Sequence, residues 1–311
     1  MDLIGVREDI SAALTDGRPV VALESSVIAH GLPSPVNLRV AHSLEEAVRA
    51  AGATPATVGV IRGRLRVGLE PEEIERLGTA GDILKCAAGD LGWAIARGVD
   101  GATTVSATVF AAASVGIDVV ATGGIGGVHR GDTGDVSADL PILAHHPVAV
   151  VAAGAKSILD LPKTLEALET LGVPVVGLGT QDFPAFYARS SGLVLDKHAE
   201  RAEDIARFCL IRWRRLKQRG GVLVACPCPE QQALAPSEVE RATARALRDA
   251  ATEGVYGKSL TPWLLASVTA SLGARTLAAN HALLLNNARV GASIATALRD
   301  LSSVSTSLTD H

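Results

Sequence analysis

Aromatic side chains are scarce in this sequence, making up 3% of its 311 residues. The core must therefore be built from alanine, valine, leucine and isoleucine, as in α/β proteins with closely packed layers. No apolar run is long enough to cross a membrane, and the acidic start MDLIGVREDISAALTDG lacks the apolar core of a secretory signal. These absences argue against membrane-spanning and secreted classes, so we expect a cytoplasmic protein.

An excess of positive charge is also lacking. Lysine and arginine number 29 against 33 aspartates and glutamates, which leaves a formal net charge of −4. This balance argues against nucleic acid or an anionic membrane surface as a partner. The four cysteines form no metal or redox motif, since Cys226 and Cys228 are separated by a single proline. We expect reduced thiols, as is usual in the cytoplasm.

Short apolar runs alternate with amphipathic helical patterns along most of the chain. The apolar runs lie at 20–25, 57–69, 101–116, 117–124, 147–154, 173–180 and 220–227. Runs of this kind are typical of a mainly parallel sheet that helices cover on both faces. We therefore predict an α/β fold, organised as a single domain over residues 1–311 with a helical C-terminal part.

Three local features refine this prediction. The run at 57–69 is expected to form a hairpin that turns at Gly63. The run at 147–154 is expected to enter a helix directly through Gly154. In the C-terminal part, Thr261 is expected to be the N-cap of a helix and Pro262 its first residue, because proline is favoured there.

A glycine-rich segment, ATGGIGGVHRG, follows the run at 117–124. Successive backbone N–H groups in such a loop can hold a phosphate, here assisted by Thr122, His129 and Arg130. The segment is not a dinucleotide fingerprint, because no helix directly follows the glycines, and it lacks the Lys-Ser/Thr pair of a P-loop. A phosphate site and a surface turn both remain open.

Three aspartates, Asp132, Asp135 and Asp139, follow in the same loop. A carboxylate next to a phosphate is unfavourable unless a cation lies between them. A hard divalent ion held by one or two carboxylates and several waters would fit. The plainer alternative is that the aspartates cap the next helix or lie in solvent.

Glu24 comes directly after the apolar residues VVAL at 20–23, and Lys156 comes shortly after the run at 147–154. Ligands of open α/β sheets bind at the carboxyl ends of the strands, so both residues are candidates for chemistry. Glu24 could act as a general acid or base, and Lys156 as a Schiff-base nucleophile. A lysine in water is almost fully protonated, so a nucleophilic one needs desolvation or a second cation such as Lys85 nearby.

Plainer explanations exist for both residues. Glu24 could be an N-cap or form an ion pair with Arg39 or Lys85, and Lys156 could be a solvated residue early in a helix. Taken with the glycine-rich loop, the residues point to a phosphosugar enzyme and to nothing more specific.

Seven longer segments resemble the pseudouridine-5'-phosphate glycosidase family, also called indigoidine synthase A-like. They are VALESSVIAHGLPSP, GATTVSATVF, ATGGIGGVHRG, VSADL, AGAKSILDLPKTLEALETLGVPVVGLGT, FPAFY and LAANHALLLNNA, in this order along the chain. The resemblance implies a three-layer α/β/α fold assembled as a homotrimer. It also implies reversible cleavage of the C–C glycosidic bond of pseudouridine 5'-phosphate, which gives uracil and ribose 5-phosphate, with one divalent ion per subunit, usually Mn²⁺.

The resemblance also assigns roles to individual residues. Glu24 of ALESS would be the proton donor, Lys156 of GAKS the covalent nucleophile, and Asp135 of GDVSADL the metal ligand. The remaining assigned residues would contact the substrate, and they are Lys85, Val105, Thr122, His129, Ser137, Ala138, Asp139 and Asn280.

A lysine nucleophile suits a C–C glycoside. Such a bond has no heteroatom leaving group, so hydrolysis by a pair of carboxylates is a poor route. Acid-assisted opening of the ribose ring and addition of Lys156 at C1' would give an amine that expels uracil by a retro-Mannich step. The imine left behind with ribose 5-phosphate would then be hydrolysed.

The chain departs from the family pattern in three places. Gly134 precedes Asp135 where the family often has FDISADL, and CPCP at 226–229 stands in place of NPIP. Ala270 takes the place of an acidic residue that, with a Gly-Gly pair, usually follows TPFLL. These departures bear on base specificity and on the neighbouring helical wall.

Two other functions stay open. Another Schiff-base lyase of aldolase type would also react through Lys156, but would not release uracil. A non-catalytic phosphosugar-binding protein would bind ribose 5-phosphate without forming a covalent adduct.

Overall fold

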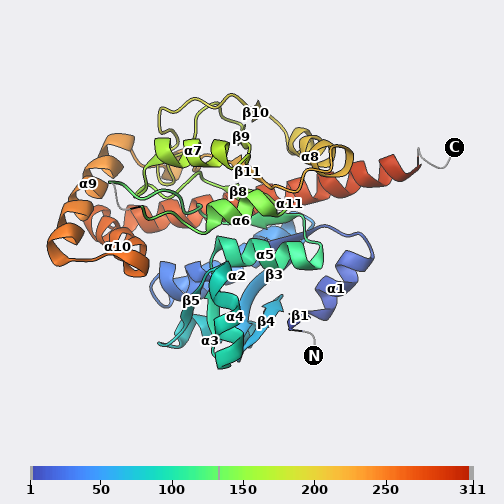
Figure 1. Ribbon diagram of the computed structural model, residues 1–311, viewed down its shortest axis with the longest axis horizontal. Helices are drawn as coiled ribbons and strands as arrows, with labels where there is room; N and C mark the ends of the chain where they lie inside the picture. Colours follow the sequence, from blue (N-terminus) through green and yellow to red (C-terminus); the bar gives the residue numbers. More distant parts are fainter. Residues whose placement is uncertain (1–2, 132–133, 308–311) are drawn as a thin grey trace.

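The computed structural model describes residues 3–131 and 134–307. Within them, eleven strands form one connected sheet (Figure 1). The strands are β1 (Ile4–Val6), β2 (Val20–Leu23), β3 (Thr54–Ile61), β4 (Arg64–Val67), β5 (Leu84–Cys86), β6 (Gly101–Thr103), β7 (Val119–Ala121), β8 (Ala149–Ala152), β9 (Val175–Leu178), β10 (His198–Ala199) and β11 (Val222–Ala225). Their order is β1-β4-β3-β2-β7-β8-β11-β9-β10, with β6 beside β3 and β5 beside β6.

The sheet is mainly parallel, as predicted. Among the described strands, only the pairings of β3 with β4 and of β3 with β6 are antiparallel. The β3–β4 pair is the expected hairpin, and it turns at Arg62 and Gly63. Strands β2, β7, β8 and β11 are buried along their whole length, which is typical of strands covered on both faces.

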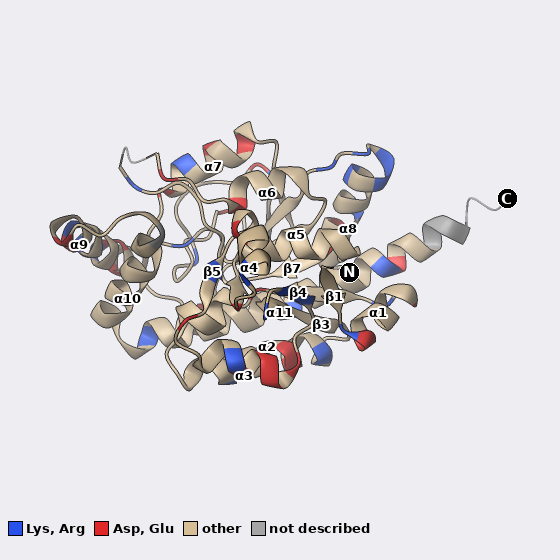
Figure 2. Ribbon diagram, turned by 60° about the horizontal axis from the view of Figure 1, so that its bottom comes forward, with Lys and Arg blue, Asp and Glu red and all other residues tan. Residues whose placement is uncertain are grey.

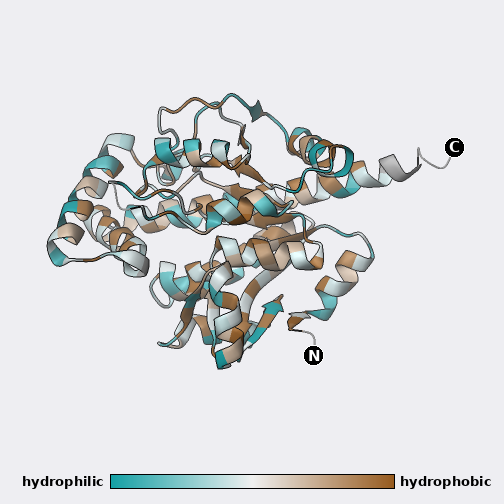
Figure 3. Ribbon diagram, in the orientation of Figure 1, coloured by the Kyte–Doolittle hydropathy of each residue, from teal (hydrophilic) through white to brown (hydrophobic). Residues whose placement is uncertain are grey.

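Helices cover both faces of this sheet and make a three-layer α/β/α arrangement. They are α1 (Glu8–Thr15), α2 (Val36–Ala50), α3 (Pro71–Thr79), α4 (Leu91–Arg97), α5 (Val105–Val115), α6 (Asp139–His145), α7 (Leu161–Thr170), α8 (Ala202–Leu210), α9 (Pro236–Glu253), α10 (Leu260–Leu272) and α11 (Ala274–Ser307). Helices α5, α6 and α7 lie on one side, and α2, α8 and α11 on the other (Figure 1). Apolar residues gather on the strands and the inner helix surfaces (Figure 3). Acidic and basic residues intermingle on the outer surfaces of α7 and α9 (Figure 2).

The C-terminal part is helical, as predicted. Helices α9 and α10 pack together at one end of the molecule, and the 34-residue α11 crosses the sheet against β2, β7 and β8 (Figure 1). The start of α10 differs from the prediction, because the helix begins at Leu260 with Ser259 as N-cap. The Thr261 side chain does not cap its own helix but lies 3.2 Å from Nε2 of His129. Within the described residues, no helix is both long and apolar enough to cross a membrane.

Two apolar runs fold differently from the prediction. The run at 101–116 is mostly the helix α5 and not a strand. The strand prediction was wrong here because a helix that is apolar all round resembles a buried strand in hydropathy. The run at 147–154 does not enter a helix through Gly154. Instead β8 ends at Ala152, a loop follows, and α7 starts only after Asp160, whose side chain accepts a hydrogen bond from the backbone N–H of Lys163. Lys156 therefore lies in a loop rather than in a helix.

Candidate active site

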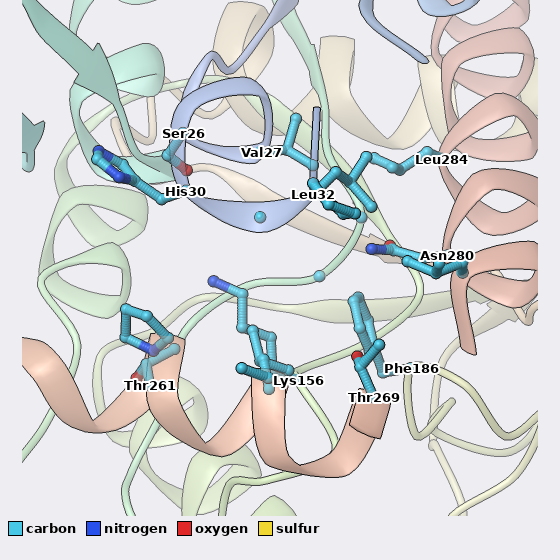
Figure 4. A pocket seen from close by; sticks show the side chains of 18 of the residues that line it. Ser26, Val27, His30, Leu32, Lys156, Phe186, Thr261, Thr269, Asn280 and Leu284 are labelled. Atoms are coloured by element: carbon cyan, nitrogen blue, oxygen red, sulfur yellow. The ribbon is translucent and has the colours of Figure 1, made fainter. Parts of the chain in front are cut away.

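A cavity of about 510 Å³ opens at the carboxyl ends of β2 and β8, beside α10 and α11. Glu24, Lys85, Lys156 and Asn280 are among the residues that line it. The amine of Lys156 points toward the middle of the cavity, with Ser26 and His30 on the facing wall and Asn280 to one side (Figure 4). The structure thus brings together four of the predicted site residues from distant parts of the chain.

Glu24 lies directly after β2 and is 7% exposed. The Thr122 hydroxyl donates a hydrogen bond to one carboxylate oxygen, and the Ser26 hydroxyl donates to the other. In the described part of the chain, Glu24 is therefore held by two hydroxyl groups rather than by an ion pair with Arg39 or Lys85. The two hydroxyl donors fix the direction in which this carboxylate points.

Lys156 owes its position to the loop that follows β8. Gly154 has a φ of +73°, and a Cβ at this residue would collide with the carbonyl oxygen of Pro184. Only glycine fits such a conformation and approach. The backbone N–H of Lys156 donates to the Ile125 carbonyl at 3.1 Å, and its own carbonyl accepts from Leu159 at 3.0 Å. The backbone is thereby fixed while the side chain reaches into the cavity.

His129 lies beside this cavity and is 7% exposed. Its Nε2 is 3.2 Å from the Thr261 hydroxyl and 3.8 Å from Oδ2 of Asp135. Burial is the main cause that lowers the pKa of His129 below its ordinary value; Asp135 opposes this, and Lys156 and Lys85 lower the pKa further. Lys85 and Lys156 therefore lie close enough to His129 for their positive charges to disfavour its protonation.

Several backbone N–H groups of the glycine-rich loop already donate hydrogen bonds within the protein. The N–H groups of Ile125, Val128 and His129 donate to Gly154, Thr164 and Asp135, at 3.1, 3.0 and 3.0 Å. The N–H of Gly126 donates to the Asp139 carboxylate at 2.8 Å. These amides are engaged within the protein, so phosphate binding by this loop stays a prediction that rests on its other groups.

Four more residues assigned to substrate binding, Val105, Ser137, Ala138 and Asp139, do not line the cavity. Asp139 is 4% exposed, and its second carboxylate oxygen accepts from the N–H of Ser106 in the first turn of α5 at 2.8 Å. Asp139 therefore bonds the first turn of the earlier helix α5 and does not cap the helix that follows, α6, of which it is the first residue. Ser137 accepts from the N–H of Asp139 at 3.2 Å, and Ala138 is the N-cap residue of α6. Val105, 1% exposed, begins α5.

Asp135 has a partly exposed side chain, with a relative exposure of 36%. Among the described residues, no group of three His, Cys, Asp or Glu side chains converges on one point that could hold a metal ion. Asp132 lies outside the described residues. A protein cage of several ligands is thus not formed by the described part, whereas an ion held by one carboxylate and several waters is compatible with Asp135.

A family model described as indigoidine synthase A like protein matches residues 9–297. The chain belongs to the indigoidine synthase A-like family. It is 51% identical over 304 residues to a pseudouridine-5'-phosphate glycosidase of Chloroflexus aurantiacus. The aligned region covers 96% of this chain and 100% of the relative. The chain is 50% identical over 300 residues to the pseudouridine-5'-phosphate glycosidase of Caldanaerobacter subterraneus subsp. tengcongensis, covering 96% and 97%.

A solved structure extends this comparison to the fold. The prealnumycin C-glycosynthase AlnA, in complex with ribulose 5-phosphate, matches with a TM-score of 0.90 and 40% sequence identity. The match covers 98% of this chain and 99% of AlnA. The family resemblance and the α/β/α fold predicted from the motifs are confirmed.

Sequence reasoning missed several residues of this site. Ser26 bonds Glu24, and Phe186, Tyr187 and Thr269 line the cavity. Ser26 belongs to the family motif ALESS, and Phe186 and Tyr187 to FPAFY. In a chain with so few aromatic residues, two adjacent rings inside a family motif were the signal that could have drawn attention to this wall.

Proposed function

We propose that this protein reversibly cleaves the C–C glycosidic bond of pseudouridine 5'-phosphate, giving uracil and ribose 5-phosphate. The observation that carries the proposal is the convergence of Lys156 and Glu24, which follow two parallel strands, on one cavity. The names of the relatives, and the ribulose 5-phosphate held in the AlnA complex, support the same class of substrate.

The first step in this proposal opens the ribose ring. Glu24 gives a proton to the ring oxygen while the bond between that oxygen and C1' breaks. The neutral amine of Lys156 forms a bond to C1' and then loses a proton to the Glu24 carboxylate. The product is an open-chain sugar phosphate joined through C1' to both the lysine nitrogen and C5 of uracil.

The second step releases the base. The lone pair of the lysine nitrogen forms a C=N bond to C1', and the C1'–C5 bond breaks as C5 of uracil takes a proton from Glu24. Water then adds to the resulting imine, which releases ribose 5-phosphate and restores the amine of Lys156. The net reaction consumes one water and needs no oxidant or reductant, so the same groups serve the reverse direction.

Other residues would bind and orient the substrate in this scheme. Lys85, at the cavity wall, would supply a second positive charge for the sugar phosphate. Asn280 would meet the substrate from α11. Asp135 would hold the divalent ion, which when bound would offset negative charge on the phosphosugar. The homotrimer implied by the resemblance is also part of the proposal, and light scattering on the purified protein tests it.

The direct test incubates the protein with pseudouridine 5'-phosphate and Mn²⁺ and measures free uracil and ribose 5-phosphate. Release of both in equal amounts supports the proposal. An aldolase-type lyase would form a borohydride-reducible adduct with another phosphosugar but would release no uracil. A binding protein would take up ribose 5-phosphate and form no adduct.

A further inference from the structure

One side of α11 lies directly on the strand ends that carry the site. Asn280, Leu284, Asn287 and Gly291 recur at spacings of four, three and four residues, which places them on one face of the helix. A Cβ at Gly291 would lie 3.3 Å from the Cβ of Ala121 and 3.4 Å from the side chain of Val21. The helix backbone therefore touches β7 and β2, and Asn280 lies about three turns before that contact, at the cavity.

Asn287 lies between these two contacts and is fully buried, with an exposure of 0%. Its Nδ2 donates a hydrogen bond to the carbonyl oxygen of Thr122 at 2.8 Å and a longer one to that of Gly123 at 3.4 Å. The backbone N–H of Thr122 donates to Val151 of the neighbouring strand. The Thr122 hydroxyl donates to Glu24. A continuous series of hydrogen bonds thus connects α11 with the carboxylate at the cavity.

We propose that Asn287 is a positioning residue for Glu24 and acts through Thr122. This inference rests on the proposed function in one respect, namely that Glu24 transfers a proton there. By holding the Thr122 carbonyl beyond the end of β7, the Asn287 amide fixes the peptide from which the Thr122 hydroxyl projects. A displacement of about 1 Å in a reacting group can reduce a rate by roughly 10²-fold.

The second polar atom of Asn287 supports this assignment. Among the described residues, Oδ1 of Asn287 is buried and has no hydrogen-bond partner. An unpaired buried oxygen is unfavourable, so an amide at this place is poorly explained by stability alone. Its orientation is set by the two carbonyl groups, because only the NH₂ end of the amide can donate to them.

The test compares Asn287→Ala and Asn287→Asp with a control, Trp213→Phe. Trp213 also donates from a buried side chain to a backbone carbonyl, that of Gly220 at 3.0 Å, but it does not line the cavity. We expect both Asn287 variants to lower kcat for uracil release by about 10- to 100-fold with KM changed less than about threefold. The control should lose comparable thermal stability and keep its kcat.

A second comparison separates positioning from general loosening. In a Thr122→Val variant the hydrogen bond from the hydroxyl to Glu24 is already lost. Adding Asn287→Ala to this variant should therefore lower kcat by a further factor of less than about three. In the Asn287 variants, amide hydrogen exchange should become faster at residues 122–124, and in Trp213→Phe it should stay unchanged there. The exchange measurement does not depend on any activity.

The inference is overturned if amide hydrogen exchange at residues 122–124 is unchanged in the Asn287 variants. It is also overturned if the kcat losses of Asn287→Ala and Thr122→Val multiply fully in the double variant. A kcat loss in Trp213→Phe equal to that of the Asn287 variants would also overturn it. If the parent protein released no uracil, the proposed function would fall. Hydrogen exchange would then still decide whether Asn287 holds the Thr122 peptide.

Discussion

Glu24→Gln separates proton transfer from binding at the cavity. Glutamine keeps the size of the side chain and retains one oxygen to accept from Thr122 or Ser26, which both donate to Glu24. The other hydroxyl can turn and accept from the new NH₂ group. The variant exchanges charge-assisted hydrogen bonds for neutral ones, so the free energy of unfolding should change by only about 1–2 kcal/mol.

The effect on the rate should be larger. A general acid contributes typically about 10²–10⁴ in rate, which at about 1.4 kcal/mol per tenfold corresponds to roughly 2.7–5.5 kcal/mol in the activation barrier. Affinity for ribose 5-phosphate should stay within a few-fold of the parent, because other groups at the cavity hold the sugar phosphate. Both directions of the reaction should slow equally, since the same groups serve a reversible reaction.

The assay pairs calorimetric binding of ribose 5-phosphate with rates of uracil release and of uracil condensation. Ser26→Ala is the matched control, because it removes a hydroxyl from the same carboxylate and leaves the acid in place; its rate loss should be smaller. If Glu24→Gln loses affinity while its rate at saturation survives, Glu24 is a binding or structural residue and the mechanism has misplaced its acid.

Three further predictions concern the nucleophile, the metal ion and a buried tyrosine. Borohydride should fix ribose 5-phosphate to the peptide that holds Lys156, and Lys156→Ala should abolish the adduct; mapping of the adduct to Lys85 would contradict the assignment. Chelation should stop turnover reversibly and Mn²⁺ should restore it, with loss of activity in Asp135→Asn, whereas full activity in excess EDTA would rule out the metal role. Burial raises the pKa of Tyr187 to about 12, against an opposing hydrogen bond from Thr269. The unfolded chain therefore releases this proton first, and stability should fall as the pH rises above about 10. The ultraviolet change from Tyr187 should appear only near pH 12 and be absent in Tyr187→Phe, and its full appearance near pH 10 in folded protein would refute the burial argument.

The mainly parallel sheet could be predicted from the sequence. The presence of Glu24 and Lys156 at the same cavity could be predicted too, because parallel strands align their carboxyl ends. Each residue followed a run of buried aliphatic residues, so a single rule placed both at the same edge. The order of the strands was not needed for that inference. Hydropathy alone could not separate β6 and α5 within 101–116, because apolar residues occur on all sides of α5 and leave no polar face with a helical period.

Other features depend on contacts between segments far apart in the sequence. Nothing near Gly154 indicates that the Pro184 carbonyl occupies the space of a side chain, and this contact places Lys156 in a loop. Asp139 follows a glycine-rich loop as a metal or phosphate ligand would, yet its oxygens bond the amides of Gly126 and Ser106. Asn287 lies 165 residues from Thr122, so no local pattern connects them.

The measurement that tests the central claim most directly is uracil release from pseudouridine 5'-phosphate by the parent protein and by Lys156→Ala, with Mn²⁺ present. We expect the parent to release uracil and ribose 5-phosphate in equal amounts. We expect Lys156→Ala, confirmed as folded by its circular dichroism, to release neither. Absence of uracil with the parent protein, or undiminished release by Lys156→Ala, would contradict a lysine-dependent cleavage of the C–C glycosidic bond.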